Sequence, residues 1–226
     1  MQLPERTNDS RHMVLVWDAA TRLFHWLVTL FVAAAYVTWR LNWMDSHAWV
    51  GKGLLGLLLF RLLWGFFGSE TARFSSFVVS PRTAARYLAS AFRRSIDREV
   101  GHNPAGGWMV LLLLTLLFGE SLSGLYVAND VADVGPLTEI TPAGLANAIT
   151  VLHRLLWNAL LVAIALHLLA ILIYALAKGH NLVLPMLTGK KSLPVGVPQP
   201  HMADSARALF FLLLGGFAAA AVAHFL

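Results

Sequence analysis

Apolar residues in this chain are grouped into five long runs that are separated by polar segments. The runs cover about residues 23–41, 48–67, 106–127, 151–177 and 206–226. Each is close to the roughly 20 residues that a helix needs to cross the hydrocarbon core of a membrane. Lipid offers the backbone no hydrogen-bond partners, so runs of this length predict helices rather than strands. The pattern predicts an all-α integral membrane protein.

Two of the polar segments have a recognisable character. Ser80-Pro81, followed by RTAARYLASAFRR, predicts an amphipathic helix at the membrane surface, with serine at the N-cap and proline at the first helical position. Leu88 and Phe92 share its apolar face. Residues 192–205 are rich in proline and predict a linker. We therefore expect a transmembrane domain over 1–191, this linker, and a fifth helix over 206–226 as an addition to the core.

Basic residues lie in alternate polar segments, which predicts the orientation of the chain. If every run crosses, one side carries Arg6, Arg11, Arg22, Arg73, Arg82, Arg86, Arg93, Arg94, Arg98, Lys178, Lys190, Lys191 and Arg207. The loop between the third and fourth runs carries Asp130, Asp133 and Glu139 and no Lys or Arg. The positive-inside rule then predicts a multi-pass protein of the bacterial inner membrane, with a cytoplasmic N-terminus and a periplasmic C-terminus.

Composition supports the membrane class and narrows the chemistry. The chain is 58% hydrophobic and 13% charged, with a mean hydropathy of +0.65. The net charge of +5 arises from the basic segments on one side of the membrane, so nucleic acid is not an expected partner. The absence of cysteine excludes disulfides, iron–sulfur ligation and covalently attached c-type haem. The polar first dozen residues argue against a removable signal peptide.

Four of the nine histidines lie at matched depths in the apolar runs. His153 and His167 on the fourth run are 14 residues apart, a rise of roughly 21 Å and about 3.9 turns, so both leave one helix face. Depth pairs His25 with His167 (the inner pair) and His47 with His153 (the outer pair). Each pair can supply both axial ligands of a b-type haem held between helices. Two stacked haems would conduct electrons across the membrane, whereas the depth difference argues against a single zinc site.

A charged residue inside the second run supports this interpretation. Arg61 lies 14 residues after His47 and therefore on the same helix face, at the depth of the inner pair. A lone guanidinium in lipid is costly and normally paired, and a haem propionate is a natural partner for it. Arg22 and Lys52 are further candidates of this kind.

Several residues leave alternatives open. Gly51, Gly53, Gly56, Gly119 and Gly124 would admit a porphyrin face or would equally serve helix packing. Glu120 is a candidate for proton transfer, although a hydrogen bond to Ser121 or Ser123 is the favoured interpretation. His102 and Arg73 are expected on the cytoplasmic side near the inner pair and are candidates for a quinone contact, with anchoring of this loop to lipid headgroups favoured.

Five stretches of the sequence carry a resemblance to a known family. They are VWDAATRLFHW (16–26), HAWVGKGLLGLLLFRLLWGFFGSETARFSSF (47–77), GHNPAGGWMVLLLL (101–114), HRLLWNALLVAIALH (153–167) and KGHNLVLPMLTGKK (178–191). Together they resemble the bacterial cytochrome b561 family, most closely the branch of b-type cytochrome subunits of nickel–iron hydrogenases. The resemblance implies a four-helix bundle with two haem b groups, whose ligands would be His25, His47, His153 and His167. The fifth helix departs from that core.

The resemblance also implies electron exchange between a quinone, ubiquinone or menaquinone, and a redox partner at the outer surface. The expected partner is a periplasmic c-type cytochrome or dehydrogenase, and an electron-transfer subunit is favoured over a standalone enzyme. A self-contained superoxide:quinone-type oxidoreductase is the alternative. A membrane scaffold or transporter without haem would leave the histidine spacing and Arg61 unexplained.

Overall fold

The protein is mostly helical in a computed structural model that describes residues 11–89, 97–127 and 135–225. Four helices are long and apolar enough to cross a membrane: α1 (Ala19–Arg40), α2 (Met44–Phe67), α5 (Pro104–Gly124) and α6 (Ala143–Ile173), which continues into the π-helical turn η2 (Tyr174–Lys178). A fifth apolar helix, α8 (Ser205–Phe225), follows near the C-terminus. The first four apolar runs therefore correspond to helices long enough to cross a membrane, although α6 begins well before the predicted residue 151.

Shorter elements connect the long helices. They are β1 (Arg11–Leu15), η1 (Glu70–Ala72), α3 (Phe74–Phe77), α4 (Pro81–Ala89), α7 (Val183–Thr188) and β2 (Lys190–Pro194). α4 begins at the predicted serine and proline, where the backbone N–H of Thr83 donates to Ser80 Oγ over 3.3 Å. Leu88 on α4 is exposed, as a helix lying on a membrane surface requires. Arg6, Phe92, Arg93, Arg94, Asp130 and Asp133, named above, lie outside the described residues.

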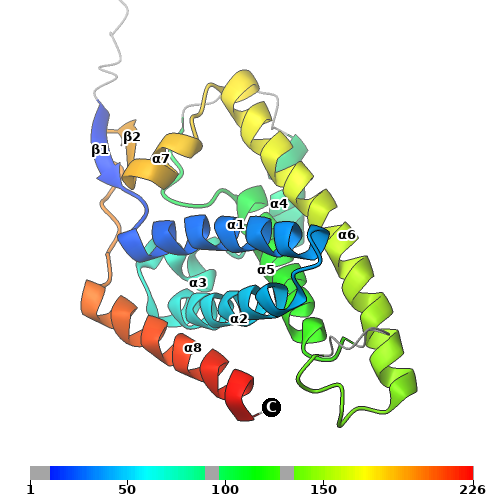
Figure 1. Cartoon of the computed structure of the whole chain (residues 1–226). Coiled ribbons are helices and arrows are strands. Elements are labelled where there is room, and N and C mark those ends of the chain that lie inside the picture. Colours follow the sequence, from blue (N-terminus) through cyan, green and yellow to red (C-terminus); the bar gives the residue numbers. More distant parts are fainter. Residues whose placement is uncertain (1–10, 90–96, 128–134, 226) are drawn as a thin grey trace, which may run out of the picture.

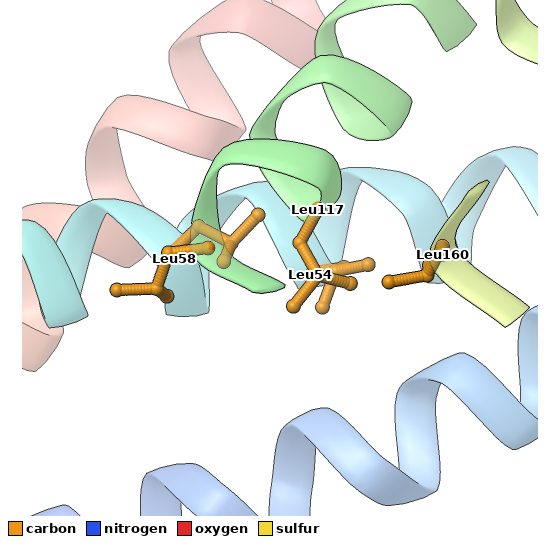
Figure 2. Packing of buried hydrophobic residues seen from close by; sticks show 5 residues of the cluster. Leu54, Leu58, Leu117 and Leu160 are labelled. Carbon is orange, nitrogen blue, oxygen red and sulfur yellow. The ribbon is translucent and has the colours of Figure 1, made fainter. Parts of the chain in front are cut away.

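The core of the bundle is a leucine cluster between three helices. Leu54 and Leu58 of α2 meet Leu117 of α5 and Leu160 of α6, as Figure 2 shows. These side chains are almost completely enclosed, and Leu58 has no exposed surface. α2 also packs against α1, so it is the central helix of the bundle (Figure 1). The middle of α2, from Leu54 to Leu58, is buried because α1, α5 and α8 all pack against this helix.

The start of α1 is fixed by Asp18. Its carboxylate accepts hydrogen bonds from the Thr21 backbone N–H over 2.6 Å and from the Trp64 indole N–H on α2 over 3.3 Å. One side chain thus caps α1 and ties it to α2. Asp18→Ala is expected to lower the stability by about 1 kcal/mol, seen as a lower thermal midpoint by circular dichroism in micelles. Asp45→Ala, in the uncapped first turn of α2, is the control; equal losses in both variants would contradict the capping role.

A small sheet closes one end of the bundle, which we call the sheet end. β1 and β2 pair antiparallel, with Met13 opposite Ser192. Val14 of β1 and Leu193 of β2 are fully buried. The sequence analysis did not predict these strands, and β2 crosses the expected domain boundary at residue 191. Lys191 on β2 also forms an ion pair of 2.8 Å with the buried Asp97, which ties the loop before α5 to the sheet.

Helix α8 is an integral part of the bundle rather than an addition to it. It runs antiparallel to α2 on the side away from α6 (Figure 1). A Cβ on Gly56 would lie 3.1 Å from Ala219 Cβ, and one on Gly215 would lie 2.8 Å from the Gly56 carbonyl oxygen. Glycine therefore permits the close approach of the two backbones.

The segment before α8 is attached to the bundle as well. The backbone N–H of Glu70 donates to the His201 carbonyl over 2.9 Å, and the His201 N–H donates to Glu70 Oε2 over 2.8 Å. The Ala203 N–H donates to Ser69 Oγ over 3.0 Å. These bonds hold the proline-rich segment against the end of α2, which sets where α8 begins.

Candidate functional site

The inner pair consists of His25 on α1 and His167 on α6. Both side chains are partly buried, and the two rings lie within electrostatic range of each other. His25 Nδ1 is enclosed and has no hydrogen-bond partner among the described residues. A buried imidazole nitrogen without a partner is costly in a packed protein, so this atom is available to a bound group.

His102 lies near the inner pair, on the side where the sequence analysis named it as a quinone candidate. Its ring lies 4.6 Å from the ring of Trp17 and 4.6 Å from that of Phe77. The pKa of His102 is lowered to about 3, mainly by burial and in smaller part by the neighbouring Arg61, His167 and His25. For His102, the favoured interpretation of a loop residue anchored to lipid headgroups is therefore wrong.

The position of His102 in the chain explains why it lies at the depth of the inner pair. Asn103 caps α5 through the Gly106 N–H over 2.8 Å, and Pro104 follows at the first helical position. A histidine just before such a start lies at the same membrane depth as the start of α1. At neutral pH its imidazole is uncharged, with one donor and one acceptor nitrogen.

Arg61 is buried beside the same group, with only 3% of its surface exposed. Its Nη2 donates to the Ala72 carbonyl over 3.1 Å, and its guanidinium lies 5.1 Å from the centre of the Phe74 ring. Nη1 is enclosed and has no hydrogen-bond partner among the described residues. The site therefore presents a buried cationic donor that an anionic group can occupy.

The outer pair consists of His47 on α2 and His153 on α6, which also lie within electrostatic range of each other. His47 Nδ1 is 3.0 Å from the Ala35 carbonyl oxygen. A carbonyl can only accept, so Nδ1 carries the proton and Nε2 is left with its lone pair, the tautomer that binds metal. His153 Nδ1 lies 2.9 Å from Ser123 Oγ, and a Cβ on Gly124 would come within 3.4 Å of the His153 ring.

Comparison with known proteins identifies the family to which the chain belongs. The model of a family described as prokaryotic cytochrome b561 matches residues 16–189. The chain belongs to this family. As a cytochrome b561 it is a b-type cytochrome of membrane electron transfer, with haem b as its cofactor. No curated protein and no solved structure matched significantly. The match covers α1 to α7 and ends before α8.

Two features of this cytochrome b561 fit the requirements of a haem. A haem iron needs only two protein ligands, because the porphyrin supplies the other four, and its propionates need cationic or polar partners. The unpartnered His25 Nδ1 and Arg61 Nη1 fit these two requirements.

The remaining charged candidates have partners within the protein. Arg22 Nη1 donates to the Leu187 carbonyl over 2.7 Å and so connects α1 with α7. The Lys52 ammonium lies 5.1 Å from the centre of the Trp49 ring. Neither has a described contact with a histidine of the two pairs. Arg22 Nε is nevertheless buried and unpartnered among the described residues, so one donor of Arg22 is free.

The structure corrects part of what the sequence predicted for the glycines and for Glu120. Gly53 faces the Phe31 ring and Gly56 faces α8, so these two serve helix packing. The favoured hydrogen bond from Glu120 to Ser121 or Ser123 is wrong: Glu120 Oε1 lies 3.4 Å from His153 Nε2. Ser123 Oγ instead donates to the Glu120 backbone carbonyl over 3.1 Å. Glu120 thus belongs to the outer site.

Proposed function

We propose that this cytochrome b561 holds two b haems and carries electrons across the inner membrane between a quinone and a periplasmic redox partner. One haem would lie between His25 and His167, and the other between His47 and His153. The observation that supports this most strongly is the presence of two histidine pairs at two depths, each joining α6 to a different helix. A single haem would leave one of these buried pairs without a purpose.

Each of these residues has a separate task in this proposal. The haems would supply a reversible one-electron iron couple, and the four histidines would hold them. The bond from His47 Nδ1 to the Ala35 carbonyl holds the imidazole ring in orientation and directs Nε2 toward the site. Arg61 would hold a propionate through its free Nη1.

The quinone is proposed to react at the sheet end, beside the inner pair. His102 supports this location, because its neutral ring can donate one hydrogen bond and accept another. The basic residues on this end predict that it faces the cytoplasm. At the opposite end, the exposed Glu139 belongs to an acidic loop that would suit a basic c-type cytochrome or a dehydrogenase subunit.

The proposal is tested by counting haem in the purified protein. A pyridine haemochrome assay is expected to give about two b haems per chain, one for each histidine pair. A count near one would leave the family membership intact and would contradict the second haem. Reduction of the haems by a quinol in proteoliposomes, with a c-type cytochrome outside as acceptor, tests the direction and the partner separately.

Arg61 provides a test of the inner site alone. Arg61→Gln is expected to lower the midpoint potential of one haem by tens of millivolts, because the positive charge favours the iron that has gained an electron. Redox titration followed by visible absorbance would measure both potentials. Arg40→Gln removes an exposed charge at the other end of α1 and is the control. An equal shift of both haems in Arg61→Gln would contradict its place at the inner site.

A further inference from the structure

A pocket outside the two histidine pairs lies where α2 ends and α8 begins. It has a volume of about 410 Å³ and is lined by Phe66, Phe67, Arg73, Arg207 and Phe211. These residues come from the end of α2, the turn before α3 and the first turns of α8. The pocket is at the sheet end, the end that carries the basic segments of the chain.

The two arginines leave most of their donors free. Arg73 Nε donates to the Gly68 carbonyl over 2.9 Å, and its two terminal nitrogens have no hydrogen-bond partner within the described part of the chain. Arg207 Nη1 donates to the Phe67 carbonyl over 3.3 Å. Asp204 approaches Arg207 Nη2 only to 3.9 Å, and both side chains of this pair are largely exposed, so solvent weakens it. The pocket therefore has a net positive charge.

The remaining lining is aromatic and continues toward the lipid-facing surface. Phe66 and Phe67 are more than half exposed, at 60% and 56%. Phe67 stacks on Phe211 with 5.8 Å between ring centres, which fixes one wall of the pocket. Guanidinium groups beside exposed aromatic rings at a helix end match a molecule with an anionic head and an apolar tail.

We propose that this pocket binds the phosphate of an anionic phospholipid, with Arg73 and Arg207 on the phosphate and the acyl chains along Phe66 and Phe67. The lipid would contact both α2 and α8, and so would join the fifth helix to the core at the membrane surface. This site does not depend on haem or on the electron-transfer proposal.

The test measures lipid binding to the full chain in neutral detergent by native mass spectrometry. Phosphatidylglycerol is the probe, phosphatidylcholine tests the need for net negative charge, and inorganic phosphate tests the free anion. The double variant Arg73→Gln/Arg207→Gln is expected to bind phosphatidylglycerol about 10- to 30-fold more weakly than the natural chain. Arg207→Gln alone, at an exposed position, is expected to show part of this loss, and an unchanged thermal midpoint would show that the fold is kept.

The matched control is Arg82→Gln/Arg86→Gln on α4, which removes two exposed arginines from the same end of the protein. It is expected to keep its affinity for phosphatidylglycerol. An equal loss in the control would show general attraction to charge and would overturn the site. Equal binding of phosphatidylcholine, or displacement of the lipid by inorganic phosphate at similar concentration, would overturn the assignment to an anionic lipid.

Discussion

Replacing His167 with alanine is expected to leave about one b haem in each chain, because the inner iron would lose one of its two protein ligands. His25→Ala is expected to have the same effect, since His25 is the other member of the inner pair. The loss would be read from the pyridine haemochrome assay and from the Soret absorbance per chain. It is the largest effect that we expect from any single substitution in this protein.

Double variants test the pairing itself. His25→Ala/His167→Ala removes two ligands of one haem, so it is expected to keep about one haem, like each single variant. His25→Ala/His153→Ala removes one ligand from each pair and is expected to keep almost none. The two double variants lose the same number of imidazoles, and only the pairing distinguishes them.

His201→Ala is the control for these variants, because His201 is exposed and its recorded hydrogen bonds are made by its backbone. It is expected to keep both haems. Similar haem contents in the two double variants would contradict the pairing of His25 with His167, whatever the total count.

Gly215→Leu is expected to destabilise the protein by about 2–3 kcal/mol, the upper part of the range for overpacking a well-packed contact. A Cβ at this position would lie 2.8 Å from the Gly56 carbonyl oxygen and 3.0 Å from the Phe60 backbone nitrogen. Backbone atoms of a central helix cannot move aside as a flexible side chain can, so α8 would have to separate from α2. The thermal midpoint in detergent, followed by circular dichroism, would record the loss.

The chain offers a matched control at the next residue. A Cβ on Gly216 meets nothing within 4 Å, so Gly216→Leu adds the same side chain to the same helix without a clash. It is expected to be neutral or slightly stabilising, because leucine favours the helix more than glycine does. Equal destabilisation of both variants would show that the close approach of α8 to α2 contributes little.

Much of the architecture could be predicted from the sequence because lipid imposes simple rules on it. The length of each apolar run determined that it forms a helix, since the backbone has no other way to satisfy its hydrogen bonds in a membrane. The start of α4 at Ser80 and Pro81 could be predicted because helix capping depends only on neighbouring residues. The depths of His25, His47, His153 and His167 followed from their places in these helices, and so did the two proposed pairs.

The errors concern contacts between segments that are far apart in the chain. The rings of Trp17 and Phe77 that enclose His102 come from distant segments, so its burial was not visible in the loop sequence. The contact of Glu120 with His153 joins α5 to α6, whereas the expected serine partners were neighbours in sequence. Local patterns favour local partners, and only packing can supply a distant one.

By itself, the sequence determined a helical membrane protein with histidines at two depths, because helix length and helix period are local properties. Only the tertiary structure decided that α8 lies against α2, that β1 pairs with β2, and which nitrogens of His25 and Arg61 lack a partner in the described chain. The physical reason is that close packing and hydrogen-bond satisfaction are properties of pairs of surfaces. The sequence pattern of one segment does not specify which other segment will pack against it.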